Sequence, residues 1–230
     1  MSTNEVRLSK ETIDKLKSLY AINQTLKIVE NSNEIRTVNE FKTCACITQI
    51  AETLPRTFCI YDLREFISVL NIIENPVLDF TNDKFVVVKS EDGRQKLRYM
   101  DGAESLINSY FDRDFKLQSE DISVSVTAAQ LKAVMSAALT LKLEYVGFKA
   151  DGESIYLSAF DRNNGSGDDT NGFSIEVGES TDTFDMFYKT EAFTILDGDA
   201  QFEISASRVS KILNADKTFW MTLDADSTFG

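Results

Sequence analysis

Apolar residues recur along the chain with two different periods, which predict a few helices among many short strands. Four segments carry apolar residues three and four positions apart, as one face of a helix requires. They are residues 9–21, 62–73, 127–141 and the short segment 189–196. Thr127 and Gln130 form a capping box, which predicts that the third helix begins directly after Thr127.

Runs rich in β-branched and aromatic residues separate the predicted helices, and turn residues bound these runs. The runs are residues 25–30, 35–39, 43–50, 77–80, 85–89, 95–100, 144–150, 154–160, 173–177, 182–188, 202–206 and 218–223. Gly93 and Gly152 stand where two tight hairpin turns are expected. The pattern predicts an α+β protein with antiparallel sheets.

The order of these elements repeats along the chain. Residues 58–70 align with residues 184–196, and residues 9–18 align with residues 127–136, at offsets of 126 and 118 positions. Because both offsets are near half of the chain, an internal duplication is expected. The duplication predicts two similar domains and a connector, at residues 1–109, 122–230 and 110–121.

The chain has 230 residues, with 24 Lys and Arg, 37 Asp and Glu and no His, so its formal net charge is −13. Without histidine the chain can form neither a Ser-His-Asp or Cys-His relay nor a zinc site with imidazole ligands. The acidic balance also excludes a nucleic-acid binder of high overall pI. Any contact with DNA must therefore be local.

No motif in the sequence indicates an enzyme, a metal site or a membrane span. Cys44, Cys46 and Cys59 do not form the spaced pairs of a redox or zinc motif, and we expect them to be small core residues. The glycine-rich residues 161–172 lack the glycine and glutamate positions of a calcium loop, which favours a solvated hairpin loop. Neither an apolar leader nor a run of ~18 apolar residues occurs. We expect a cytosolic protein that is not an enzyme and binds no cofactor or metal.

Positive charge is concentrated on the predicted helices. Together with Lys142, which directly follows the third helix, they carry a net charge of +2, whereas the whole chain carries −13. Ordinary solvated helix faces are the more frequent cause of such a pattern, and the count alone favours them. The alternative is that the polar helix faces look toward a polyanion while the acidic sheets face outward.

Three segments resemble, in the same order, the sliding clamps of T-even-type bacteriophages, which are processivity subunits of the phage DNA polymerase. LSKETIDKL with residues 21–23 resembles the first helix of that family and its exit. IYDLREFISVL resembles the second helix with the strand that enters it, and LDADSTFG is similar to the C-terminal signature. The three segments cover about a quarter of the chain, and residues 91–122 are too divergent to align.

The resemblance implies the DNA clamp fold, in which two similar domains each pack two helices on antiparallel β-sheets. It further implies a homotrimeric ring that encircles double-stranded DNA, binds the phage DNA polymerase and is opened by a clamp loader complex. Such a ring holds DNA by topology, so its contacts need only be weak and independent of sequence. The implied function is that of a DNA polymerase sliding clamp in phage DNA replication, in the cytoplasm of the infected bacterial host.

In this family the helices line the central hole, so the resemblance assigns DNA binding to the basic residues of the predicted helices. These candidates are Lys10, Lys15, Lys17, Arg64, Lys132, Lys142 and Lys189. Lys15 is also placed to pair with Glu11 one turn earlier.

The partner pocket of the family lies near the connector and accepts a short C-terminal peptide of the polymerase. By position, the candidates for partner binding are Tyr110, Phe111, Phe115, Leu117 and Leu223. An equally good interpretation is that these aromatic residues only join the two domains. A second class of function also stays open, a β-rich virion or scaffold assembly protein without a role at DNA.

Overall fold

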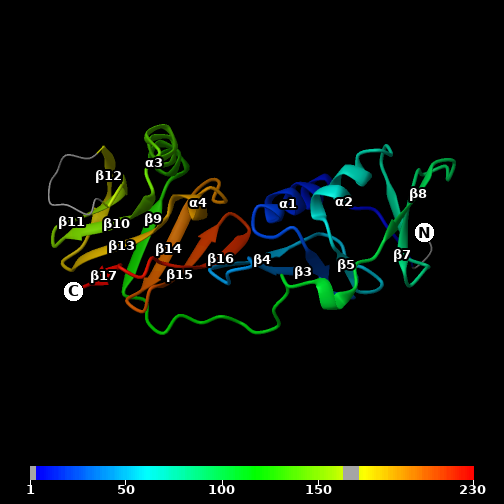
Figure 1. The fold of residues 1–230 in the computed structure, drawn as a ribbon, viewed down its shortest axis with the longest axis horizontal. Coiled ribbons are helices and arrows are strands. Elements are labelled where there is room, and N and C mark those ends of the chain that lie inside the picture. Colours follow the sequence, from blue (N-terminus) through cyan, green and yellow to red (C-terminus); the bar gives the residue numbers. More distant parts are fainter. Residues whose placement is uncertain (1–3, 163–170) are drawn as a thin grey trace. The chain divides into compact units, whose positions relative to one another are not determined.

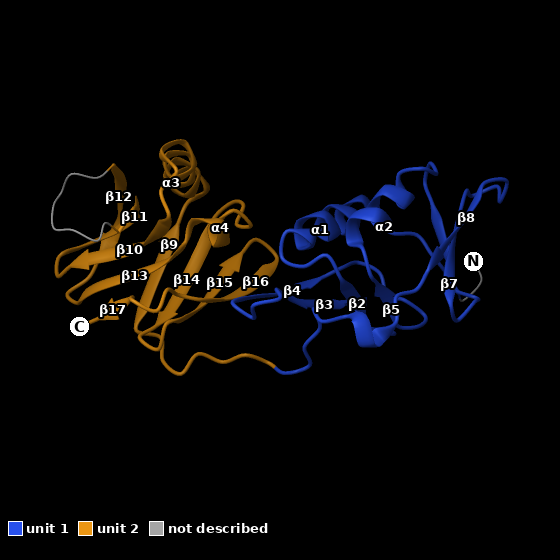
Figure 2. Ribbon diagram, viewed as in Figure 1, with its two compact units in different colours: residues 1–113 blue, residues 114–230 orange. Residues whose placement is uncertain are grey.

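A computed structural model describes residues 4–162 and 171–230, and it divides into two compact units, residues 1–113 and 114–230 (Figure 2). Most of the predicted glycine-rich loop, residues 163–170, lies outside the described residues. Each unit combines two helices with antiparallel strands, which confirms the predicted α+β class.

Unit 1 places two neighbouring helices among short antiparallel strands (Figure 1). Its elements are β1 (Glu5–Val6), α1 (Lys10–Tyr20), β2 (Leu26–Ile28), β3 (Glu34–Val38), β4 (Cys44–Gln49), β5 (Phe58–Ile60), α2 (Leu63–Leu70), β6 (Val77–Asp79), β7 (Phe85–Lys89), β8 (Lys96–Met100) and the 3-10 turn η1 (Glu104–Leu106). One sheet has the strand order β1-β6-β7-β8, while β2 pairs with β5 and β3 pairs with β4.

Unit 2 has the same plan with longer strands (Figure 1). Its elements are β9 (Ile122–Val126), α3 (Ala128–Leu141), β10 (Tyr145–Asp151), β11 (Ser154–Phe160), β12 (Gly172–Glu179), β13 (Thr183–Lys189), α4 (Thr190–Phe193), β14 (Ala200–Ser205), β15 (Val209–Asn214), β16 (Lys217–Thr222) and β17 (Thr228–Phe229). One sheet has the order β12-β11-β10-β13-β17. The other joins β16, β15, β14 and β9 in that order, and helix α3 packs on β10, β11 and β12.

Side chains outside the helices set three of the four helix starts. Ser9 accepts a hydrogen bond from the Thr12 amide, and Asp62 accepts one from the Glu65 amide. Thr127 forms the predicted capping box. The fourth helix, α4, has only four residues and is shorter than predicted, because its N-cap residue makes no side-chain hydrogen bond and β-branched residues follow it.

Aromatic rings fill the core of each unit. In unit 1, Phe58 meets Phe66 and Phe80 edge to face, with ring centroids 5.3 and 5.6 Å apart. In unit 2, Phe202 lies 4.8 Å from Phe148 and 5.7 Å from Phe193. The predicted core role of the three cysteines is confirmed, since all three are buried free thiols, and burial raises the pKa of Cys44 to about 12.

Unit 2 depends on one glycine in the middle of β10. Gly147 is opposite Phe187 of β13. A Cβ atom on Gly147 would lie 2.3 Å from the backbone oxygen of Met186 and 2.4 Å from the Cα of Phe187. The close approach of these two strands therefore requires a residue without a side chain.

Candidate nucleic-acid interface

Helix α1 carries three of the predicted DNA-binding lysines, and two of them have partners. Lys15 donates a hydrogen bond to the Gln49 backbone oxygen at 2.7 Å and, as predicted, pairs with Glu11 at 2.9 Å. Lys17 pairs with Asp14 at 2.7 Å, and its hydrogen bond lowers the pKa of that carboxyl group. Lys10 is exposed and has no ion-pair partner among the described residues.

Helix α2 contributes one cation. The helix buries Leu63, Phe66, Val69 and Leu70, so its other side faces solvent. Arg64 lies on that exposed side and forms no ion pair within the described part of the chain.

The predicted DNA-binding lysines at helices α3 and α4 also include both unpaired and ion-paired side chains. Lys132 and Lys142 are exposed, and neither has an ion-pair partner in residues 4–162 and 171–230. Lys142 ends α3 in the left-handed conformation, with φ of 56°. Lys189 precedes α4, pairs with Glu144, and donates a hydrogen bond to the Tyr145 hydroxyl at 2.8 Å, and these bonds, chiefly that to Glu144, raise its pKa.

The seven predicted residues therefore fall into two groups. Lys15, Lys17 and Lys189 are neutralised by nearby carboxylates. The unpaired group is Lys10, Arg64, Lys132 and Lys142. Only the unpaired group leaves its full charge for a phosphate backbone, because an ion-paired lysine must first give up its partner.

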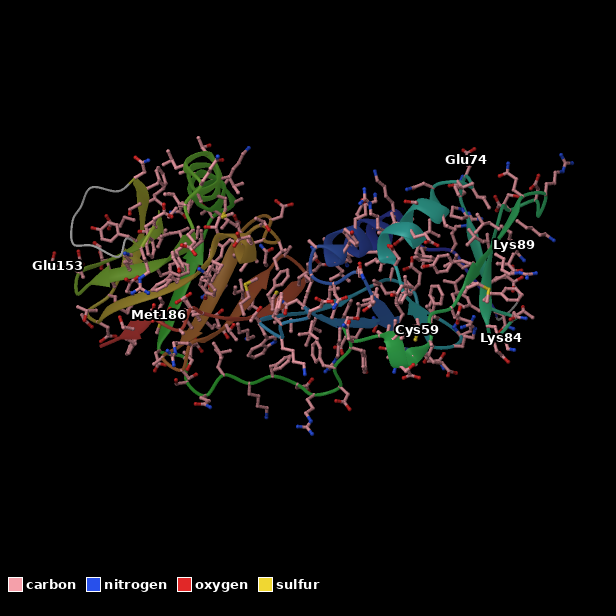
Figure 3. The ribbon with its side chains drawn as sticks, viewed as in Figure 1. Cys59, Glu74, Lys84, Lys89, Glu153 and Met186 are labelled. Atoms are coloured by element: carbon pink, nitrogen blue, oxygen red, sulfur yellow. The ribbon has the colours of Figure 1, made fainter. Side chains whose placement is uncertain are left out.

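Charged side chains also cover the remaining surface of both units. Figure 3 labels Glu74, Lys84 and Glu153, which are exposed, and Cys59 and Met186, which lie buried within their units. Since the chain carries 37 acidic against 24 basic residues, the surface outside the unpaired group is predominantly negative.

The predicted partner-binding residues occupy three different surroundings. Tyr110 lies under the ammonium group of Lys27, 4.6 Å from its ring centre, and Phe111 lies under the guanidinium of Arg36 at 5.6 Å. Both contacts belong to unit 1. Leu223 is only 7% exposed and faces the core of unit 2.

Phe115 and Leu117 line a pocket of about 390 Å³ in unit 2. The floor of the pocket includes a row of side chains that face one another across three strands. They are Glu203 of β14, Lys211 of β15 and Trp220 of β16. The ring of Phe115 lies on Trp220, with centroids 5.7 Å apart.

Trp220 was not among the predicted partner-binding residues, although the sequence carries a signal for its exposure. Thr218, Trp220 and Thr222 alternate with the buried Phe219, Met221 and Leu223. A strand that points its only tryptophan to the side of its threonines exposes a large aromatic surface, which something must cover. The same alternation explains why Leu223 points into the core.

Two of the sheet edges differ in their charge. Among the described residues, the edge strand β8 pairs only with β7, and the edge strand β12 pairs only with β11. The exposed charges on β8 are Lys96 and Arg98, whereas those on β12 are Glu176 and Glu179. The two edges therefore have opposite charge.

The described residues contain no metal site and no membrane span. Within residues 4–162 and 171–230, no three His, Cys, Asp or Glu side chains are grouped as a metal ion requires. None of the helices in the described part of the chain has the length and apolar content that crossing a bilayer requires.

No protein-family model matches the chain. Over 225 residues the chain is 29% identical to a sliding clamp of the Vibrio phage KVP40, and the match covers 96% of this chain and 100% of that protein. The predicted resemblance to the sliding clamps is confirmed. The similarity extends across both units, beyond the three segments that first indicated it.

Solved structures have the same fold. The chain matches the PCNA of A. fulgidus bound to the C-terminal region of FEN-1 with a TM-score of 0.68 and 12% identity, over 97% of this chain and 99% of that one. It matches the DNA polymerase III subunit beta of Pseudomonas aeruginosa with a TM-score of 0.66 and 10% identity, over 95% of this chain and 63% of that one. These matches confirm the predicted clamp fold, and with the phage relative they support the predicted function of a DNA polymerase processivity clamp.

Proposed function

We propose that three copies of this chain close into a ring around double-stranded DNA and tether a phage DNA polymerase to its template. A clamp loader complex opens the ring, which acts in the cytoplasm of the infected bacterial host and catalyses no reaction. The observation that carries the proposal is a clamp fold in which the sheet edges β8 and β12 have opposite charge.

In the proposed ring, β8 of one copy pairs with β12 of the next. Lys96 and Arg98 then face Glu176 and Glu179, and the backbone groups of both edges gain hydrogen-bond partners. Because this contact joins two different surfaces, it repeats from head to tail until the ring closes.

Exposed apolar side chains beside each edge support the same contact. In unit 1 a pocket of about 540 Å³ next to β8 is lined by Tyr61, Met100 and Leu106, and each of these side chains is more than half exposed. In unit 2, Leu139 and Leu141 at the end of α3 are 61% and 41% exposed. We expect these leucines to enter that pocket on the neighbouring copy, which removes both apolar surfaces from water.

The unpaired group supplies the proposed contact with DNA. Three copies of Lys10, Arg64, Lys132 and Lys142 give a mildly positive lining, while the acidic exterior repels DNA from the outside. Attraction of this strength is screened by salt and independent of sequence, so the ring can slide.

The polymerase is proposed to bind at the connector, residues 110–121, between domains of residues 1–109 and 122–230. One structural relative, the A. fulgidus PCNA, is bound to the C-terminal region of another protein. By analogy, the pocket of Phe115 and Leu117 receives a C-terminal peptide of the polymerase.

Size-exclusion chromatography with light scattering tests the ring. The expected mass is about three times that of the 25.9 kDa chain. A monomer or an open-ended polymer would contradict the clamp and favour an assembly protein.

The retention of loaded protein on DNA tests the topology. Loaded rings should stay on a nicked circle, leave after the circle is cut, and stay again when both ends of the linear DNA are blocked by bound proteins. Equal lifetimes on open and blocked linear DNA would show that the protein grips DNA and does not encircle it.

A further inference from the structure

Trp220 is the only tryptophan of the chain, and it lies on the outer face of β16 under an aromatic ring of the connector. The rings of Phe115 and Trp220 are tilted by 44° with centroids 5.7 Å apart, within the range of favourable aromatic pairs. Phe115 is itself 41% exposed, so it covers Trp220 from the solvent side and is not part of the core.

The indole nitrogen of Trp220 shows that this contact is incomplete. Its Nε1 atom is buried and has no hydrogen-bond acceptor among the described residues. A buried donor without an acceptor is unfavourable, and the N–H of a buried tryptophan usually has a partner. Phe115 covers the apolar ring but offers no side-chain acceptor.

The neighbouring charges on the pocket floor already satisfy each other. Lys211 pairs with Glu203 at 2.7 Å, so the row beside Trp220 has no net charge. This floor favours an apolar segment with a free carbonyl group over a strongly acidic or basic one.

We propose that Phe115 is a displaceable plug over Trp220. When the partner peptide binds, one of its aromatic side chains replaces Phe115 on the Trp220 ring. A backbone carbonyl of the peptide then accepts the hydrogen bond from Trp220 Nε1. The inference rests on the proposed peptide site and adds the class of ligand and its regulation. Because Trp220 stays covered in both states, the gain on exchange comes largely from the satisfied N–H group.

The plug lowers peptide affinity in the free clamp, since only the fraction of molecules with Phe115 displaced can bind. The test compares the wild-type trimer with Phe115→Ala and with Phe229→Ala. Phe229 is the matched control, because its ring stacks on Phe184 in the same unit and does not line the pocket. The probe is a synthetic peptide of the last twelve residues of the polymerase that this clamp serves.

Quenching of Trp220 fluorescence by acrylamide measures the plug without any ligand. The quenching constant should rise about twofold or more in Phe115→Ala and stay unchanged in Phe229→Ala, because only the first variant uncovers the indole ring. An unchanged constant in Phe115→Ala would overturn the plug.

Isothermal titration calorimetry then measures peptide affinity. We expect the peptide to bind Phe115→Ala about tenfold more tightly than the wild-type clamp, as removal of an occupied competing state predicts. Equal or weaker binding by Phe115→Ala would overturn the plug and leave the peptide site intact. If neither protein binds the peptide, the proposed peptide site is wrong, and the plug with it.

The variant Trp220→Phe tests the proposed hydrogen bond to the peptide. Trp220→Phe keeps an aromatic surface and removes the N–H donor, so it should weaken peptide binding severalfold. Unchanged affinity would show that the peptide does not accept a hydrogen bond from this residue.

Discussion

The two units have a similar arrangement of helices and strands, but their charged residues are distributed differently. In unit 1, α1 carries acidic residues one turn from its lysines, and the sheet edge at β8 is basic. In unit 2, α3 carries Lys132 without any acidic residue, and the edge at β12 is acidic. Two identical edges would repel each other, whereas these two attract. This difference is what the proposed head-to-tail contact between copies requires.

The units also differ in how closely their strands approach. Unit 1 packs Phe58 against the rings of Phe66, Phe80 and Tyr99, so its core contacts are between side chains. Unit 2 brings β10 and β13 so close at Gly147 that only a missing side chain permits it. Unit 2 should therefore tolerate less change at its glycine.

Replacement of Gly147 by alanine should have the largest effect on stability. The added Cβ meets backbone atoms that cannot move independently, so we expect a loss of about 3 kcal/mol in the free energy of unfolding. Urea denaturation measures it. The control in unit 1 is Gly102→Ala, where the nearest atom lies 3.3 Å from the new Cβ and a loss below about 1 kcal/mol is expected. Similar losses for both variants would remove the contrast between the units.

Reversal of charge at β8 should weaken the trimer. Lys96→Glu with Arg98→Glu turns the attraction toward Glu176 and Glu179 into repulsion, at about 2 kcal/mol for each contact between copies. Light scattering over a dilution series should show dissociation at higher protein concentration than for the wild type.

The reciprocal change at β12 provides the control for this experiment. Glu176→Lys with Glu179→Lys, combined with the β8 variant, should restore the trimer because the charges are again opposite. If neither variant changes the concentration at which the trimer dissociates, the two edges are not in contact.

Single lysines should have the smallest effect. Lys132→Ala removes an unpaired cation, so we expect the length of DNA made in one binding event to fall about twofold in a primer-extension assay with polymerase and loader. Lys17→Ala removes a cation that Asp14 already neutralises, and no change is expected. Equal effects of the two variants would contradict the division into paired and unpaired lysines.

Local features of the chain predicted much of the fold. The caps at Ser9, Asp62 and Thr127 depend only on residues three positions away, and the helix starts were predicted correctly. The alternation of apolar and polar residues predicted most of the strands. The strands β1, β9, β15 and β17 were missed, and β9 and β15 pair with β14 on its two sides.

The sequence by itself determined the fold class, the order of the elements, the burial of the cysteines and the set of basic residues on the helices, because these follow from neighbouring residues and composition. Only the tertiary structure decided which cations remain unpaired. Lys15 meets a backbone oxygen 34 positions away, and Lys189 meets a carboxylate 45 positions away. The pocket at Trp220 was likewise decided by strand register, which places Glu203, Lys211 and Trp220 in one row. Contacts between residues distant in the chain depend on how the strands pair, and no local sequence pattern specifies that pairing.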